Sequence, residues 1–312
     1  MAEVKRTSIG GQALIEGVMM RGPKDVAIVV RRPDNGLEVK KEKVEGIVSK
    51  YKLNKIPFLR GSIALIDSML LGVRALTYSA EIAEEAWEDE EEEDKFGEFM
   101  EKIFKDKAND VFLYFSVAMA LAVSILVFFI FPTFVVNWLK RFTDKNIILN
   151  LTEGILRMIM FFGYIVAISK LDDIKRVFQY HGAEHKSIYC YEHGEELTVE
   201  NARKYTTLHP RCGTSFLFIV MFVSIIMFSL VGWPNPWMRV VLRLALLPVV
   251  AGISYEIIKL AGRSNSPIMR AISYPGLMLQ NLTTLEPDDD QLEVALEALK
   301  IVLEENDEDD IW

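Results

Sequence analysis

Four long apolar runs constrain the fold of this chain more than any other feature of its sequence. They cover residues 111–131, 147–169, 214–233 and 239–261 of a chain of 312 residues. A helix that spans a bilayer needs about 20 mostly apolar residues, and each run reaches that length. Because a chain in lipid must satisfy its main-chain hydrogen bonds internally, we expect each run to be helical. The predicted fold class is therefore mainly α, a polytopic membrane bundle of about four spanning helices.

The charges of the connecting segments predict how this bundle is oriented. The loop 170–213 and the N-terminal segment are rich in Lys and Arg, whereas the segment 233–238 carries no charge. The positive-inside rule then places both termini and the 170–213 loop in the cytoplasm. Lys140, Arg141 and Lys145 argue against this orientation, because they would face outward. The expected partner is the lipid bilayer and not nucleic acid, which would need a clustered basic face with aromatic platforms.

A small soluble module is expected before the first span. The runs 26–32 and 37–44 flank the turn sequence PDNG, which is typical of a β-hairpin. The preceding stretch GGQALIEGVMMRGP, residues 10–23, is dense in glycine and carries Glu16 and Arg21 among apolar residues. We expect a loop there, either an ordinary turn into the hairpin or a flap over a cytoplasmic site.

Residues 59–81 predict a helix with an unusual charge pattern. Its charged residues recur at every seventh position, which places them on one narrow stripe of an otherwise apolar helix. We favour a helix that lies in the membrane interface or against the bundle, since four charges at membrane depth are costly. A fifth span is the alternative. The four residues are Arg60, Asp67, Arg74 and Glu81.

The charge distribution suggests four consecutive segments. An N-terminal module (1–58) is followed by the amphipathic helix with an acidic linker (59–110), whose residues 84–94 are almost all acidic. The membrane bundle with its histidine-rich loop (111–285) comes next, and an acidic helix and tail (286–312) end the chain. The net charge of −9 arises from the acidic segments and therefore says little about a binding surface.

The motif HGAEH, residues 181–185, is the strongest chemical signal in the chain. If it is helical, His181 and His185 lie four residues apart on one face and can both ligate one ion. Glu184 projects beside them, where it could ligate the ion or act as general base on water that the ion polarises. The order H-x-x-E-H is also that of the inverted zinc-protease motif, a likeness of five residues only. Gly182 weakens the helix somewhat.

A metal site needs at least one further protein ligand. All four histidines lie between residues 181 and 209, and both cysteines lie in or next to that stretch, where reduced thiols are expected. The predicted topology brings three candidates to the cytoplasmic membrane face, ranked His209, then Glu256, then Cys212. Zinc is the first expectation, with iron and manganese as alternatives. The competing interpretation is a metal-free polar network at a helix end.

Charged residues also occur inside the predicted spans. Glu153 and Arg157 are four residues apart in the second run, and Arg239 and Arg243 in the fourth. Intramembrane charges usually face one another or a water-filled cavity. We favour a salt-bridge network that locks two spans together; a cavity that admits an anionic or zwitterionic group is the alternative.

Three stretches together resemble a known family. They are GGQALIEGVMMRGP, VFQYHGAEHKSIYCYEHGEELTVENARKYTTLHPRCGTSF and the C-terminal SYEIIKLAGR with PGLMLQNLTTLEPDDDQLEVALEAL. The chain is similar over nearly its whole length to the YqhQ-like family of bacterial membrane proteins, a domain of unknown function that is also described as predicted metal-dependent enzymes. The resemblance implies a multi-spanning protein of the bacterial inner membrane with a suspected metal site, and it implies no substrate.

These observations favour a metal-dependent membrane hydrolase with its site at the cytoplasmic face. His181 and His185 would bind the ion with His209 or Glu256, Glu184 would handle the proton, and the substrate would be a membrane peptide or a lipid. The alternatives are a transporter or channel-like protein in which the histidines gate or sense, and a scaffold that uses its acidic tails. The sequence leaves the oligomeric state open, a homo-oligomer included.

Overall fold

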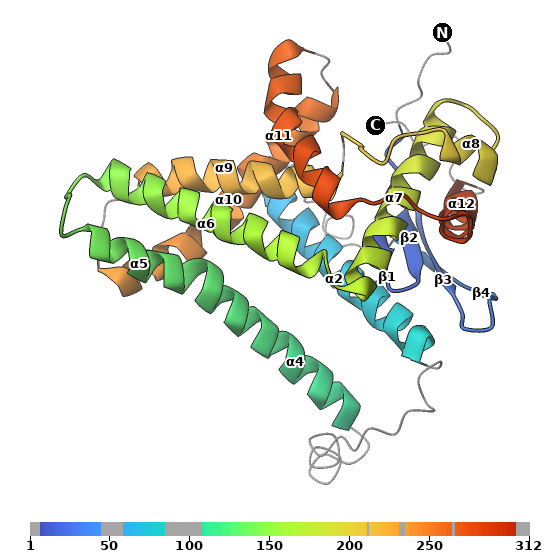
Figure 1. Cartoon of the computed structure of the whole chain (residues 1–312), viewed down its shortest axis with the longest axis horizontal. Coiled ribbons are helices and arrows are strands. Elements are labelled where there is room, and N and C mark those ends of the chain that lie inside the picture. The colour runs from blue at the N-terminus through green and yellow to red at the C-terminus, as the bar shows by residue number, and fades with distance from the viewer. Residues whose placement is uncertain are drawn as a thin grey trace. The chain divides into compact units, whose positions relative to one another are not determined.

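The computed structural model describes residues 7–44, 59–84, 108–210, 212–230, 235–263 and 266–303 (Figure 1). Most of the acidic linker 84–94, most of the short connection 231–235 and the acidic tail beyond residue 303 lie outside these ranges. Four strands come first: β1 (Gly10–Leu14), β2 (Gly17–Arg21), β3 (Asp25–Arg31) and β4 (Leu37–Lys43). The helices before residue 170 are α2 (Leu59–Glu84), α4 (Ala108–Ile125), α5 (Phe131–Leu139) and α6 (Asn146–Ile168), with a π-helical segment, Leu126–Ile130, between α4 and α5. The later helices are α7 (Asp172–Glu192), α8 (Val199–Arg203), α9 (Gly213–Leu230), α10 (Pro236–Arg263), α11 (Pro267–Thr283) and α12 (Asp289–Leu303).

The mainly helical fold class is confirmed, together with a small N-terminal sheet. The sheet is antiparallel and its strands follow the order β1-β2-β3-β4. The predicted hairpin is confirmed as β3 and β4, in the register Val29↔Val39, with Asn35 at a positive φ of 63° in its turn. Asparagine is one of the few residues that adopt this conformation readily.

The stretch 10–23 was expected to be a loop, and this prediction is wrong. It forms a second hairpin, β1 and β2, closed by a two-residue turn in which Glu16 has a φ of 51°. Val18, Met19 and Met20 of β2 are all buried, so this strand lacks the alternation of apolar and polar residues that marks a half-exposed strand. Gly17 is needed because a Cβ there would lie 2.5 Å from the carbonyl oxygen of Val29.

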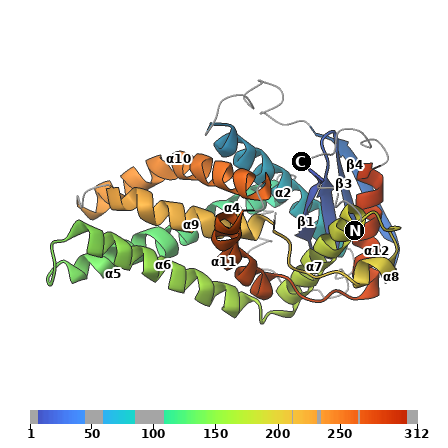
Figure 2. The same cartoon turned by 90° about the horizontal axis from the view of Figure 1, so that it is seen from above.

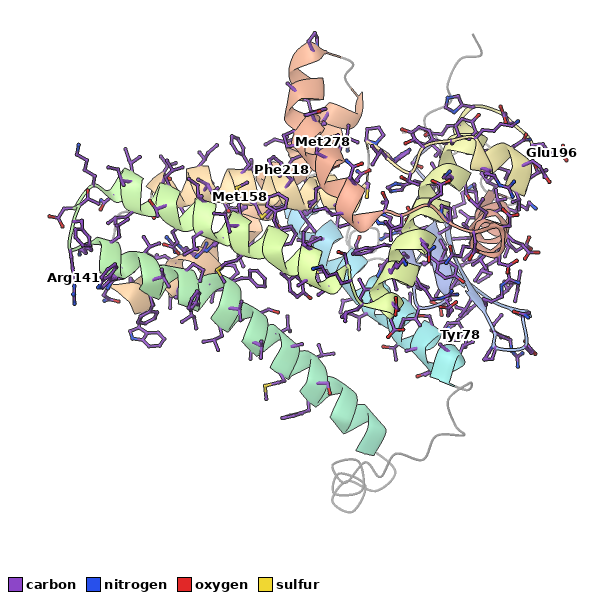
Figure 3. All side chains as sticks on the ribbon, in the orientation of Figure 1. Tyr78, Arg141, Met158, Glu196, Phe218 and Met278 are labelled. Carbon is purple, nitrogen blue, oxygen red and sulfur yellow. The ribbon has the colours of Figure 1, made fainter. Side chains whose placement is uncertain are left out.

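Each face of the sheet packs against helices. One core joins strands β2 and β3 with α7, α8 and α12, and it includes Met20, Tyr180 and Leu299. The other core joins the opposite face with α2, through Ala75 and Ile82. Both views show α7 and α12 beside the strands (Figures 1 and 2). These contacts fix the C-terminal half of α2 to the sheet. The ammonium nitrogen of Lys40 in β4 lies over the ring of Tyr78 in α2 (Figure 3), 4.5 Å from the ring centroid.

Five helices in the described ranges are long and apolar enough to cross a membrane. They are Arg60–Ala83, Phe115–Leu139, Asn146–Ile168, Gly213–Leu230 and Trp237–Ala261. The last four correspond to the four predicted runs, so the chain is an integral membrane protein by these helices. The first span extends well past its predicted end at residue 131, because Pro132 falls in the first turn of α5, where its missing N–H costs little. The helix Arg60–Ala83 has the lowest mean hydropathy of the five.

The chain forms two compact units. One takes its described residues from within 1–86, 164–223 and 247–312, and it contains the sheet, α7, α8 and α12. The other takes them from within 87–163 and 224–246. The histidine motif belongs to the first unit, and the intramembrane charges belong to the second.

Candidate metal centre

Helix α7 carries the histidine motif and places it inside the first unit. Asp172 and Asp173 lie in its first turn, where carboxylates stabilise the partial positive charge of a helix N-terminus. Helix α7 packs against the sheet and α12, and His185 is 1% exposed. The expected i, i+4 geometry is confirmed, since the rings of His181 and His185 have centroids 4.5 Å apart.

Cys212 completes a group of three metal-ligating side chains. Its Sγ atom lies 3.1 Å from Nε2 of His181. One ligand atom from each of His181, His185 and Cys212 lies within 4.8 Å of the others. Cys212 directly precedes α9, and its sulfur accepts a hydrogen bond from the main-chain N–H of Thr214 at 3.5 Å. The thiolate is the form of cysteine that ligates a metal.

The Nδ1 atoms of both histidine rings are hydrogen-bonded to main-chain carbonyls. Nδ1 of His181 lies 2.8 Å from the carbonyl oxygen of Thr283, and Nδ1 of His185 is hydrogen-bonded to the carbonyl of Thr207. A carbonyl only accepts, so Nδ1 carries the proton in each ring and Nε2 presents a lone pair. Metal-ligating histidines are oriented by this kind of contact.

One buried atom in this group has no hydrogen-bond partner. Nε2 of His185 is shielded from solvent, and no polar atom of the described residues bonds to it. A buried polar atom without a partner costs about 1–3 kcal/mol. An ion bound at the two Nε2 atoms and the sulfur would satisfy it, and nitrogen with thiolate is a donor set suited to zinc. The residues present therefore fit a metal ion.

Glu184 lies beside the group without belonging to it. Its carboxylate is 5% exposed and accepts a hydrogen bond of 2.9 Å from the main-chain N–H of Gly11 in β1. Burial raises the pKa of this carboxyl above its ordinary value, opposed by His181 and by the Gly11 hydrogen bond. A Cβ at Gly11 would lie 2.8 Å from Cδ of Glu184 and 2.7 Å from the carbonyl oxygen of Met19. The glycine lets the strand approach the carboxylate this closely.

A cavity of about 770 Å³ opens onto these side chains. His181, Glu184, His185 and Cys212 all line it, and β1 lines it from Gly10 to Ala13. Its remaining walls are mostly apolar and come from α2, α7, α9 and α10, including Leu65, Met69, Phe216, Leu217, Val220 and Leu247. The metal-ligating group therefore shares one cavity with residues of three candidate membrane helices.

His209, ranked first as a further ligand, lies next to this group. Its ring centroid is 5.5 Å from that of His185, and its Nε2 is 3.7 Å from a carboxylate oxygen of Glu192. Gln280 holds the main chain of His209 from both sides, accepting from its N–H at 2.7 Å and donating to its carbonyl at 2.8 Å. His209 also lines the cavity, as a residue positioned by a carboxylate.

The other predicted site residues of this unit lie in ion pairs. Glu256, ranked second, accepts two hydrogen bonds from the guanidinium of Arg60, at 2.7 and 2.5 Å. Glu16 accepts two from Arg176, both 2.5 Å long. Arg21 is 3.4 Å from the hydroxyl of Ser68 on α2. Glu16 and Arg21 therefore tie the first hairpin to α7 and α2, and neither lines the cavity of the metal-ligating group.

The second unit brings together the four intramembrane charges. Glu153 is 1% exposed, and its carboxylate lies 2.7 Å from Arg157 and 3.8 Å from Arg239, and contacts Arg243 directly. Thr133 donates a further hydrogen bond of 2.7 Å to the same carboxylate. The favoured interpretation of a salt-bridge network is the arrangement found here.

Several residues that build the site were not identifiable in the sequence. Thr207 and Thr283 contribute through carbonyl oxygens, which any residue type supplies, so no side-chain signal marks them. Gly11 gave a partial signal through the glycine density of its stretch. Gln280 is a buried amide that follows the apolar residues Leu277, Met278 and Leu279 in α11, and that combination is a usable sign of a polar contact.

The chain was compared with family models, with curated proteins and with solved structures. The model of the family described as "Protein of unknown function (DUF1385)" matches residues 56–305. The chain is 38% identical over 299 residues to the "Uncharacterized protein YqhQ" of Bacillus subtilis (strain 168), with 94% of this chain and 92% of that protein covered. No solved structure matches.

Proposed function

Because the chain belongs to the DUF1385 family, whose function is unknown, we propose its function from the site itself. We propose a metal-dependent membrane hydrolase in which His181, His185 and Cys212 hold a divalent ion, zinc by preference. Glu184 is the carboxylate that accepts and returns the proton. The substrate is a component of the membrane.

The shared cavity is the observation that carries this proposal. A soluble substrate would need a site open to water, whereas this cavity is walled by apolar side chains of α2, α9 and α10. Two imidazoles and a thiolate would supply three protein ligands, the number that catalytic zinc centres use. The bound ion would supply a Lewis acid that polarises a carbonyl or a water molecule.

Glu184 is placed for proton transfer and not for ligation. It lines the cavity but is not among the three grouped ligands. The N–H of Gly11 fixes one of its carboxylate oxygens, which orients the side chain. A positioned carboxylate beside an open metal position is the arrangement that general acid–base catalysis requires.

The conduit alternative has less support. A through-path lined by arginines would need those arginines to face an open cavity. Arg157, Arg239 and Arg243 instead converge on Glu153, in a cluster that is almost entirely buried. This arrangement supports a structural role for the charges in the second unit.

The cores of the first unit limit how the chain can cross the membrane. The sheet, α7 and α12 pack in one core, so they lie on the same side of the bilayer. The chain must therefore cross an even number of times between the end of β4 and the start of α7, where three candidate helices lie. The connection 45–58 is too short to hold a spanning helix, and the connection 85–107 is too highly charged. By their sequences, neither adds a crossing to this number. We infer that α2 enters the membrane without crossing it, because its C-terminal half is fixed to the sheet.

This topology agrees with both termini on one side, which we propose is the cytoplasm of a bacterial inner membrane. The number of crossings between α7 and α12 is also even, since α9 and α10 lie between them. The basic loop 170–213 supports the cytoplasmic assignment. The metal-ligating group then sits at the cytoplasmic face.

A carboxylate-to-amide exchange tests the hydrolase proposal. Glu184→Gln keeps the shape of the side chain but cannot accept the proton, so we expect normal metal content and a loss of turnover of at least about 100-fold. Glu196→Gln, at an exposed position before α8, is the matched control and should behave as wild type. The assay uses the zinc-loaded protein in mild detergent with fluorogenic apolar peptides and phosphatidylcholine as substrates. Equal turnover by Glu184→Gln and wild type would contradict the assigned role.

A further inference from the structure

We propose that the substrate is an extended, uncharged, apolar segment of polypeptide that lies along the outer edge of β1. This inference rests on the proposed hydrolase and deepens it by choosing between peptide and lipid. Three observations carry it: the outward main-chain groups of Ala13 in β1, the open space at Gly10, and the charges of the cavity wall.

β1 is an edge strand whose outer side faces the cavity. Among the strands that the structure describes, it pairs with β2, on one side. The N–H of Gly11 points away from β2, because it donates to Glu184, and the N–H of Ile15 points the same way, to the hydroxyl of Ser79. Main-chain groups alternate along a strand, so Ala13, midway between these two residues, presents its N–H and C=O on the same outer edge. Ala13 is half-buried and lines the cavity. An added strand is recognised by such groups.

Open space lies next to this edge. A Cβ built at Gly10 meets no atom within 4 Å, although Gly10 lines the cavity. Gly11 has a different role, since the contact with Glu184 fills the space around it. The cavity is therefore open at Gly10, whose Cβ position lies on the opposite face of the strand from that of Gly11.

The charges of the cavity wall favour a neutral peptide over a phospholipid. Among the described residues that line the cavity, none is Lys or Arg, and Glu184 is the one carboxylate. A phosphate group would find no cationic side chain among these residues, so the bound ion alone would offset its charge, and it would meet the carboxylate of Glu184. Amide groups carry no net charge, and apolar side chains suit the walls formed by Phe216, Leu217 and Val220.

The reaction on such a segment is hydrolysis of one peptide bond. Water adds its oxygen to the carbonyl carbon and the C–N bond breaks. One proton of that water passes through Glu184 to the departing amine nitrogen, and the other remains with the new carboxyl group. No oxidant or further reactant is required.

A binding experiment on the full chain in mild detergent, loaded with zinc, tests the inference. The probe is a capped decapeptide of Ala, Leu and Val with a dansyl group, followed by fluorescence anisotropy. A second probe has every amide nitrogen methylated, which keeps the apolar side chains but removes the main-chain donors. We expect the methylated probe to bind at least about tenfold more weakly, since each lost hydrogen bond contributes about 1 kcal/mol.

Glycine variants locate the binding position. Gly10→Leu fills the open space and should weaken binding of the first probe by about tenfold, with zinc content unchanged. Gly163→Leu is the matched control, because a Cβ at Gly163 also meets no atom within 4 Å and Gly163 does not line the cavity. It should leave binding unchanged. If Gly10→Leu loses zinc, the smaller Gly10→Ala takes its place and should show a weaker effect in the same direction.

The outcomes separate this inference from the hydrolase proposal. Binding that needs amide donors and Gly10, but without cleavage, supports docking along β1 and contradicts the hydrolase. Equal binding of both probes, no effect at Gly10, or displacement of the peptide by short-chain phosphatidylcholine overturns the inference while leaving the metal centre standing.

Discussion

Nε2 of His181 lies 3.1 Å from Sγ of Cys212, which joins α7 to the segment that begins α9. The first belongs to a helix that packs on the sheet, and the second directly precedes a candidate membrane span. With His185 these two side chains form a group that could hold a metal ion, where the sheet-packed helix meets a candidate membrane span.

Gly182, between the two histidines, should not tolerate a side chain. Its Cβ would lie 2.0 Å from the carbonyl oxygen of Leu285, and that segment is held to α7 by a hydrogen bond of 2.9 Å from Leu285 N–H to the carbonyl of Phe178. We therefore expect Gly182→Ala to lower the free energy of unfolding by about 2 kcal/mol or more, and zinc affinity with it, despite the higher helix propensity of alanine. Thermal unfolding in detergent and zinc titration measure the two effects.

Gly163→Ala is the control for Gly182→Ala. Gly163 lies in α6 with open space around its Cβ position, so the helix propensity of alanine acts alone. We expect no loss of stability and a gain of up to about 1 kcal/mol. Destabilisation by both variants would show that the contact with Leu285 is not the cause.

The inferred path of α2 predicts which residues are accessible from which side. Single cysteines replacing Asn35, in the turn between β3 and β4, and Glu81, near the end of α2, should react with an impermeant thiol reagent from the same side of the membrane. A cysteine replacing the exposed Phe142, after α5, should react from the other side. Labelling of intact and of permeabilised cells distinguishes the two sides of the membrane. Asn35 and Glu81 on opposite sides would mean that α2 crosses.

Glu153 should be the residue on which the second unit depends most. Replacement by Gln leaves the buried Arg239 and Arg243 and the half-buried Arg157 without their shared carboxylate, and uncompensated buried charge costs about 3–5 kcal/mol. A clearly lower apparent Tm in detergent is expected for Glu153→Gln. The exposed carboxylate exchange Glu81→Gln is the control and should leave Tm within about 1–2 °C of wild type. An unchanged Tm for Glu153→Gln would show that the cluster is not structural.

Cys190 should be chemically inert in the folded protein. Burial, then the nearby carboxylate of Glu195, raises the pKa of its thiol to about 11. At pH 8 the thiolate fraction is then about one in a thousand, and alkylation by iodoacetamide should be slow until the chain unfolds. The raised pKa also means that the thiol form stabilises the fold below pH 9, and this contribution is lost as the pH rises from about 9 to 11. Rapid native-state alkylation, mapped by mass spectrometry, would contradict this.

The spans and the histidine motif could be predicted from sequence because they depend on local patterns. A run of about 20 apolar residues is enough by itself to predict a spanning helix. The spacing of His181 and His185 puts both side chains on one face of their helix. The same reasoning failed for residues 10–23. Val18, Met19 and Met20 are buried on both faces of the sheet by α2, α7 and α12, and that covering depends on segments far away in the chain.

Cys212, the third residue of the metal-ligating group, shows the same limit of prediction from local patterns. Cys212 was ranked below His209 and Glu256, because a topological argument brings all three to one level without resolving distances of a few ångströms. The structure gives Glu256 a partner in Arg60, places His209 beside Glu192, and turns the sulfur of Cys212 toward His181. No local pattern distinguishes these outcomes, since each depends on a neighbour from another segment.

Metal content tests the central claim most directly. The protein is purified in mild detergent without chelator, supplied with zinc, freed of excess and analysed for its elements. We expect about one zinc per chain in wild type and in Glu256→Gln, and none in Cys212→Ala or in the double variant His181→Ala/His185→Ala. A wild-type protein that holds no metal, or a Cys212→Ala variant that keeps it, would contradict the account.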